Sequence, residues 1–203
     1  AASSDYPLRD VYKRQSVFCK ALEVEEVANA LVVPFGAGKT RGISRPAGVF
    51  NATGALVARA TCLRSSRLKV TTTPPLPGPA TVTESLSGTW LFGGMLYGHF
   101  GHFLCESTAR LWALDAPGPR IDGVLFVPKK HVAREWRFLG PVQPWLSMTG
   151  IQVPVRLAVE PVKVARLMVP DQGFGTGDMI AAAPEYRAFV AAHFGAKVAA
   201  KAV

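Results

Sequence analysis

The chain has 203 residues, of which 49% are apolar and 18% are charged. This balance is typical of a globular protein and excludes a disordered chain or a coiled coil. The formal net charge of +9 attracts anionic partners such as nucleic acid, an acidic membrane surface, an anionic polysaccharide or a nucleotide sugar. The basic residues lack interleaved aromatic residues and a recognition helix, so a specific nucleic-acid partner is not expected.

Cysteine usage and hydropathy indicate the compartment. The three cysteines are widely separated and form no CxxC pair, which predicts neither a disulfide framework nor a zinc ribbon: Cys19, Cys62 and Cys105. No apolar run reaches the roughly 18 residues of a membrane span, and the first residues lack the apolar centre of a signal peptide. We expect a cytoplasmic protein, with peripheral association at the inner membrane through basic residues left open.

The first part of the chain is expected to be rich in β-structure. Residues 1–15 are polar and aperiodic, and we interpret them as non-native or disordered. Residues 16–73 form the β-rich N-terminal segment of the interpretation. In it, 19–30 is predicted to be a short helix with its glutamates outward, 30–35 an apolar strand, and 49–73 two strands joined by turns.

A partial phosphate-loop motif interrupts this segment. The letters GAGKT at 36–40 end like G-x-x-x-x-G-K-[ST], but Val33 stands where the first glycine belongs. The sequence RGISRPAG that follows does not read as a helix. A nucleotide-binding protein that relies on this loop is therefore the least favoured of the functions considered.

Residues 74–80 are rich in proline and predict a stiff, extended connector between two parts of the chain. Residues 81–203 then alternate short apolar strands with helices, which favours βαβ units and a parallel sheet. The expected strands are 89–92, 123–127, 153–159 and 162–169. The expected helices are 98–114, a region at 129–148 broken by Pro141 and Pro144, and 184–201.

The expected helix at 98–114 carries the residues best suited to chemistry. At about 100° per residue, one side is largely apolar and suited to burial against the sheet, while the other gathers four polar side chains within a sector of about 80°. These are His99, His102, Glu106 and Arg110. His102 and Glu106 are spaced i, i+4, so the carboxylate can orient the imidazole as in general-base pairs.

The glycines before this helix, among them Gly94 and Gly98, allow a ligand or another backbone to approach its start, where free N–H groups favour an anion. Alternatives for the same residues are a capping or core histidine and a surface Glu–Arg ion pair. A metal site is not favoured, because His99, His102 and Glu106 lack the H-E-x-x-H pattern and an acidic cluster.

The run YGHFGHFLCESTARLWAL, followed shortly by IDGVLFVP, resembles the N-terminal half of the glycosyltransferase family 61 pattern. The upstream sequence GVFNATGALVARATCLR and the later GIQVPVRLAVEPVKVARLMVP are similar to strands that the family places there. The resemblance covers roughly residues 30–195. It implies that the family's motif histidine and acid fall on His102 and Glu106 as catalytic residues; either could be the base.

The resemblance implies an α/β fold, with 81–203 as the Rossmann-like N-terminal domain of a GT-B glycosyltransferase. Such an enzyme is inverting, uses a nucleotide sugar as co-substrate without another cofactor, and transfers the sugar to a glycan acceptor, in bacterial relatives typically for surface polysaccharide. We expect 81–203 to be truncated before a donor-binding domain and inactive alone. His99 and Arg110 are added as substrate-binding residues from the polar side of the expected helix, and Gly94 and Gly98 are added from the glycines that precede it. The alternative is a non-catalytic glycan- or anion-binding domain.

Overall fold

The centre of the protein is a mixed sheet of six strands in the order β3-β1-β10-β7-β8-β9. The structure is a computed structural model, and it describes residues 21–35, 44–82, 84–129 and 135–195. The strands are β1 (Val24–Val33), β3 (Gly48–Phe50), β7 (Glu84–Leu96), β8 (Gly123–Pro128), β9 (Val155–Leu157) and β10 (Val162–Pro170). The α/β fold class expected from the sequence is confirmed at this level.

Four neighbouring strands of this sheet, β10-β7-β8-β9, are parallel, whereas β1 runs antiparallel to both β10 and β3. The link from β7 to β8 contains α2 (Phe100–His102), a π-helical turn (Phe103–Ser107) and a 3-10 turn (Leu111–Leu114). Helix α3 (Glu135–Met148) links β8 to β9, and only four residues link β9 to β10. The chain then reaches α4 (Pro184–Val190) and a π-helical turn (Ala191–Gly195).

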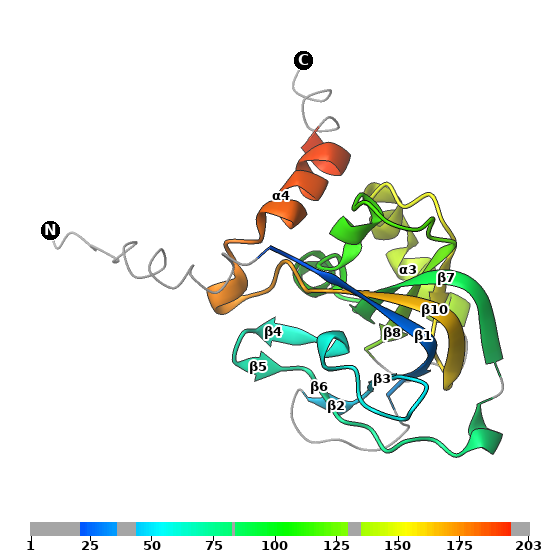
Figure 1. The fold of residues 1–203 in the computed structure, drawn as a ribbon. Coiled ribbons are helices and arrows are strands. Elements are labelled where there is room, and N and C mark those ends of the chain that lie inside the picture. Colours follow the sequence, from blue (N-terminus) through cyan, green and yellow to red (C-terminus); the bar gives the residue numbers. More distant parts are fainter. Residues whose placement is uncertain (1–20, 36–43, 83, 130–134, 196–203) are drawn as a thin grey trace, which may run out of the picture.

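The two faces of the sheet are covered differently, as Figure 1 shows. One face packs against the segments that carry β2 (Arg45–Pro46) paired with β6 (Thr71–Thr72), and β4 (Leu63–Ser65) paired with β5 (Leu68–Lys69). The other face packs against helices, with Leu146 of α3 and Phe189 of α4 in the same apolar cluster as Phe126 of β8. The alternation along β8 follows from this arrangement, because Val124 and Phe126 face the helices while Leu125 and Val127 face the small strands.

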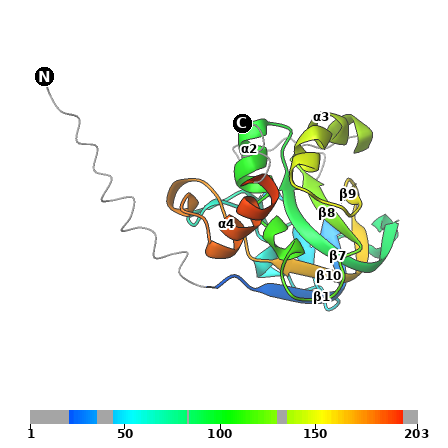
Figure 2. The same ribbon diagram turned by 90° about the horizontal axis from the view of Figure 1, so that it is seen from above.

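The sheet is strongly bent in the first part of β7. Gly88 has a φ of +79°, which favours glycine, and Figure 1 shows β7 curving sharply at this end. Glu84 at the start of β7 accepts a hydrogen bond from Arg156 of β9, at 2.7 Å, although β8 lies between the two strands in the sheet order. This bend explains how four residues suffice to link β9 to β10. Figure 2 shows the long strands β1, β10 and β7 side by side.

The predicted helix at 19–30 is wrong for its described part, since strand β1 begins at Val24. Val24, Val27 and Ala30 are spaced three apart, like one face of a helix. In the structure this spacing comes from a local irregularity of the strand: Asn29 has a φ of 50° and no partner in the register, between Ala28 and Ala30. The register with β10 is the same before and after Asn29, but the buried positions change from Val27 to Ala30 across it.

The strands of residues 81–203 pair parallel with one another as predicted, and the sheet is mixed because β1 and β3 add antiparallel pairs to it. These two strands come from the 16–73 segment, so the parts of the chain on either side of the 74–80 connector share one sheet. The predicted strands at 123–127 and 162–169 are confirmed nearly to the residue. Helix α3 continues through Pro141 and Pro144 where the sequence predicted a break. The GAGKT motif lies outside the described residues.

Candidate functional site

The candidate site lies at the carboxyl ends of β7 and β8. Tyr97 directly follows β7, and Lys129 directly follows β8, with its backbone N–H bonded to the carbonyl of Leu96. In open α/β sheets, ligands bind outside this edge because the loops that leave the parallel strands converge there. Residues 98–107 begin at this edge and bring the predicted histidines and glutamate to it.

The backbone of 98–114 is not the single helix that the sequence predicted. One α-helical turn, with Phe103 N–H bonded to His99 C=O, passes into a π-helical turn, with Thr108 N–H bonded to Phe103 C=O. A separate 3-10 turn follows from Leu111. Single π-helical turns are rare and often occur at functional sites, because the wider turn re-aims the side chains.

His102 and Glu106 come together as the i, i+4 spacing predicted. His102 Nδ1 lies 2.6 Å from Glu106 Oε1. The Glu106 side chain is 4% exposed, whereas that of His102 is 39% exposed. The pair therefore consists of an enclosed carboxylate and an imidazole that solvent or a ligand can reach.

Glu106 is held by three side chains from different parts of the chain. The Tyr97 hydroxyl donates to Oε2 at 2.6 Å, and the Arg64 Nε donates to Oε1 at 3.3 Å, beside the His102 contact. Tyr97 and Arg64 are both donors, so Glu106 acts as an acceptor. The proton in the contact between His102 and Glu106 is therefore assigned to His102 Nδ1. The Nε2 of a neutral His102 then carries the lone pair.

Tyr97 and Lys129 complete the surroundings of this pair. The Tyr97 ring stacks on the His102 ring, with centroids 5.0 Å apart, and the Lys129 ammonium lies 5.5 Å from the centroid of the same tyrosine. Burial and the hydrogen bond to Glu106 raise the pKa of Tyr97, so the phenol stays protonated. Burial, followed by the positive charges of Arg45 and Arg64, lowers the pKa of Lys129.

His99 and Gly98 lie near the pair but make weaker contributions. His99 is the N-cap residue of α2, makes no side-chain cap hydrogen bond, and has its ring tilted 5.5 Å from that of His102. Gly98 is exposed in the link between β7 and α2. Both residues stay candidates for contact with a ligand.

The prediction that Arg110 shares one side of a helix with the histidines is wrong. Its buried guanidinium donates to the carbonyls of Arg59, Thr61 and Pro170. The irregular turns before it rotate it into the interior, so the geometry indicates a structural role. Gly94 lies against the side chain of Arg110. Its φ is +82°, and a Cβ at this position would lie 3.2 Å from Arg110 Nε.

Arg64, Tyr97 and Lys129 are the residues that the sequence reasoning missed. Tyr97 and Lys129 carried a usable signal, because each follows an apolar strand and the ends of parallel strands meet at one edge. The sequence around Arg64 contained no such signal. Arg64 reaches the site from β4, a three-residue strand that packs on the face of the sheet opposite the helices.

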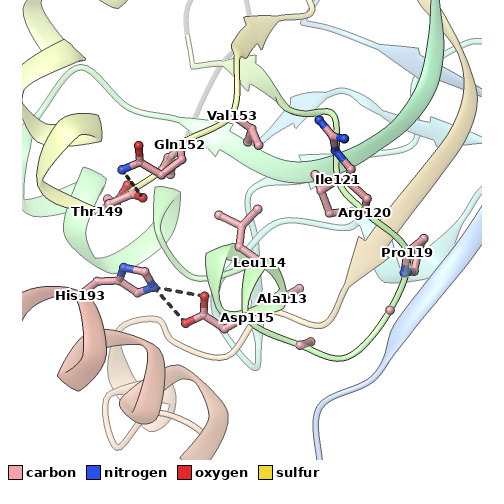
Figure 3. A pocket seen from close by; sticks show the side chains of 14 residues that line it. Ala113, Leu114, Asp115, Pro119, Arg120, Ile121, Thr149, Gln152, Val153 and His193 are labelled. Carbon is pink, nitrogen blue, oxygen red and sulfur yellow. Dashed lines mark hydrogen bonds and ion pairs between the residues drawn. The ribbon is translucent and has the colours of Figure 1, made fainter.

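A cavity of about 420 Å³ lies at the opposite edge of the sheet, where Ile121 and Val153 precede β8 and β9. Figure 3 shows His193 and Asp115 facing each other across part of its wall, with His193 Nε2 2.9 Å from Asp115 Oδ2. Neither His102 nor Glu106 lines this cavity.

Across residues 21–35, 44–82, 84–129 and 135–195, no group of three or more His, Cys, Asp or Glu side chains is placed to hold a metal ion. Among the helices described, none combines the length and the apolar character that crossing a bilayer requires. Comparisons of this chain with protein-family models, with curated proteins and with solved structures found no match.

Proposed function

We propose that the chain is the acceptor-side domain of an inverting, nucleotide-sugar-dependent glycosyltransferase of surface-polysaccharide biosynthesis. The resemblance of YGHFGHFLCESTARLWAL to glycosyltransferase family 61 suggests this function. The observation that carries the proposal is the 2.6 Å contact between His102 Nδ1 and an enclosed Glu106, at the carboxyl edge of parallel strands. Such a pair has the composition and placement of a general base with its orienting group.

In this proposal His102 is the base and Glu106 is a positioning residue. Glu106 is almost fully enclosed and already accepts from Tyr97 and Arg64, so it is poorly placed to reach an acceptor. By holding the proton on Nδ1, it keeps the Nε2 lone pair of His102 available. His102 is exposed enough to meet a hydroxyl group.

The reaction would be a single in-line displacement. The acceptor hydroxyl transfers its proton to His102 Nε2 while its oxygen forms a bond to the anomeric carbon of the donor sugar. The bond from that carbon to the nucleoside diphosphate breaks on the opposite side, which inverts the anomeric configuration. The leaving diphosphate takes the bonding electrons and is neutralised by the groups that bind the donor.

The order of the parallel strands supports a Rossmann-like domain. Counted along the chain from β7, the strands β9-β8-β7-β10 have the order 3-2-1-4 of a doubly wound sheet. The links that contain α2 and α3 supply two βαβ units, although the link from β9 to β10 contains no helix. In a GT-B enzyme most donor contacts come from a second domain, so we propose that donor binding lies there.

The test is turnover by the full-length enzyme with a panel of nucleotide sugars. His102→Ala should lower kcat by about 100-fold or more, since general base catalysis contributes roughly 10²–10⁴-fold. Glu106→Ala should also lower kcat strongly. His193→Ala is the matched control, because this histidine also contacts a carboxylate, Asp115, but lies at the opposite edge of the sheet. Near-normal turnover in both His102 and Glu106 variants would contradict the proposal.

A non-catalytic glycan- or anion-binding domain is the second candidate. The observation that favours it is the position of Arg64 and Lys129 around the carboxylate of Glu106. If this candidate holds, the full-length protein binds an anionic glycan and releases no nucleoside diphosphate from any donor in the panel.

A further inference from the structure

Three positively charged side chains among the described residues lie around the His102–Glu106 pair. Arg64 comes from β4, Lys129 from the end of β8, and Arg45 from β2, and all three act electrostatically at this site. Arg64 and Lys129 both interact with the carboxylate of Glu106. Burial is the largest cause that lowers the pKa of Lys129, and the positive charges of Arg45 and Arg64 lower it further, against the smaller opposing effect of Glu106.

The positions of Arg64 and Lys129 indicate whether they contact the acceptor or the leaving diphosphate. Arg64 Nε and His102 Nδ1 contact the same oxygen, Glu106 Oε1, at 3.3 Å and 2.6 Å. Lys129 lies over Tyr97, whose ring stacks on His102. In an in-line displacement the base and the leaving group lie on opposite sides of the anomeric carbon. Cations beside the base are therefore on the acceptor side, away from the departing diphosphate.

We propose that the acceptor is an acidic glycan, whose carboxylate or phosphate group is bound by Arg64 and Lys129 beside His102. This inference rests on the proposed function for the position of the acceptor. The guanidinium supplies a planar fork that matches two anionic oxygens, and the ammonium supplies a point charge. A neutral sugar of the same shape has no anionic group to attract these two cations and would bind more weakly.

The experiment compares the binding of methyl β-glucuronide and methyl β-glucoside by calorimetric titration of the 203-residue chain. The two sugars differ only in that the glucuronide has a carboxylate where the glucoside has a hydroxymethyl group. The glucuronide should bind about 10-fold tighter or more, and high salt should weaken its binding. Arg64→Gln and Lys129→Gln should each remove most of this preference. Arg156→Gln is the matched control: this arginine pairs with Glu84, at the amino end of β7, and its loss should change nothing.

Two further arms separate the possible failures. His102→Ala should retain the glucuronide preference, so binding can be seen even if no glycosyl transfer is found and the proposed function fails. Binding of both sugars with equal affinity, or of neither, overturns the inference. It is also overturned if Arg64→Gln and Lys129→Gln weaken inorganic pyrophosphate binding without affecting the glucuronide, since the cations would then serve the donor.

Discussion

Glu106 is the residue on which the site depends. Its carboxylate is enclosed and accepts from Tyr97, Arg64 and His102, which belong to three different segments. A buried carboxylate is tolerated only when such donors replace the water that it has lost. The geometry of the histidine therefore depends on the tyrosine and the arginine.

Tyr97→Phe should lower the free energy of unfolding by about 1.5–3 kcal/mol at pH 7, as expected for a hydrogen bond to a charged group. The folded-state pKa of Tyr97 is raised above the ordinary value of 10.0, so the unfolded chain loses the phenolic proton first. The hydrogen bond's contribution is thus fully present below pH 10 and declines as the pH rises further. Urea unfolding of both proteins from pH 7 to pH 11 measures the difference.

Tyr186→Phe is the control for this comparison. Tyr186 is also buried, but its hydroxyl pairs with the neutral hydroxyl of Thr108, at 2.6 Å. Its loss should cost about 0.5–1.5 kcal/mol at pH 7. A loss in Tyr97→Phe no larger than in this control, or one that does not change up to pH 11, would show that the bond to Glu106 is not the cause.

At the scale of elements, two irregularities decide where the polar residues point. The irregular backbone at Asn29 makes β1 resemble a helix in the spacing of its apolar residues, and the π-helical turn at Phe103–Ser107 separates Arg110 from the histidines. Local irregularities of this kind depend on packing partners distant in the sequence. The apolar runs of β8 and β10 are visible in the sequence itself, and they predicted both strands nearly to the residue.

The same distinction holds for the site. The His102–Glu106 contact lies within one turn, so its spacing predicted it. The contact between Arg64 and Glu106 spans 42 positions and requires the segment that carries β4 to pack on the sheet. Local periodicity contains no information about such a contact. The antiparallel pairing of β1 with β10 escaped prediction for the same reason, since the partners lie at opposite ends of the described chain.

Gly93→Ala should destabilise the protein by about 1–3 kcal/mol, the range for overpacking a core. A Cβ at Gly93 would lie 2.4 Å from the ring of Phe126, which is fully buried in the neighbouring strand. Gly140→Ala in α3 is the opposite case, because a Cβ there meets nothing within 4 Å. It should stabilise by about 0.5–1 kcal/mol through helix propensity. Thermal unfolding of both variants tests the signs, and equal shifts would contradict the packing argument.

At the scale of the whole molecule, β1 joins the beginning of the chain to its last strand. It lies between β3 and β10, so the sheet cannot be completed from the later segments alone. Val27, Ala30 and Val32 of β1 belong to the apolar cluster on the face that the small strands cover. A unit that starts after the 74–80 connector would leave β10 as an uncovered edge.

A chain that begins at Ser44, and so lacks β1, should fail to form a soluble monomer. Its exposed β10 edge and the uncovered apolar face would favour aggregation. A chain that begins at Ala21 keeps β1 and is the matched control; it should be soluble and unfold cooperatively. Size-exclusion chromatography and circular dichroism distinguish the two, and a folded monomer from the shorter chain would show that β1 is dispensable.

Arg110 gives the molecule a form of cooperativity. Its guanidinium holds carbonyls of Arg59, Thr61 and Pro170, which lie 51, 49 and 60 positions away. The segment that follows β3, the end of β10 and the turns that carry the histidines therefore meet at one buried cation. If one of these segments opened alone, the buried guanidinium would lose a hydrogen-bond acceptor, so we expect the edge that carries His102 to open only together with the rest of the sheet.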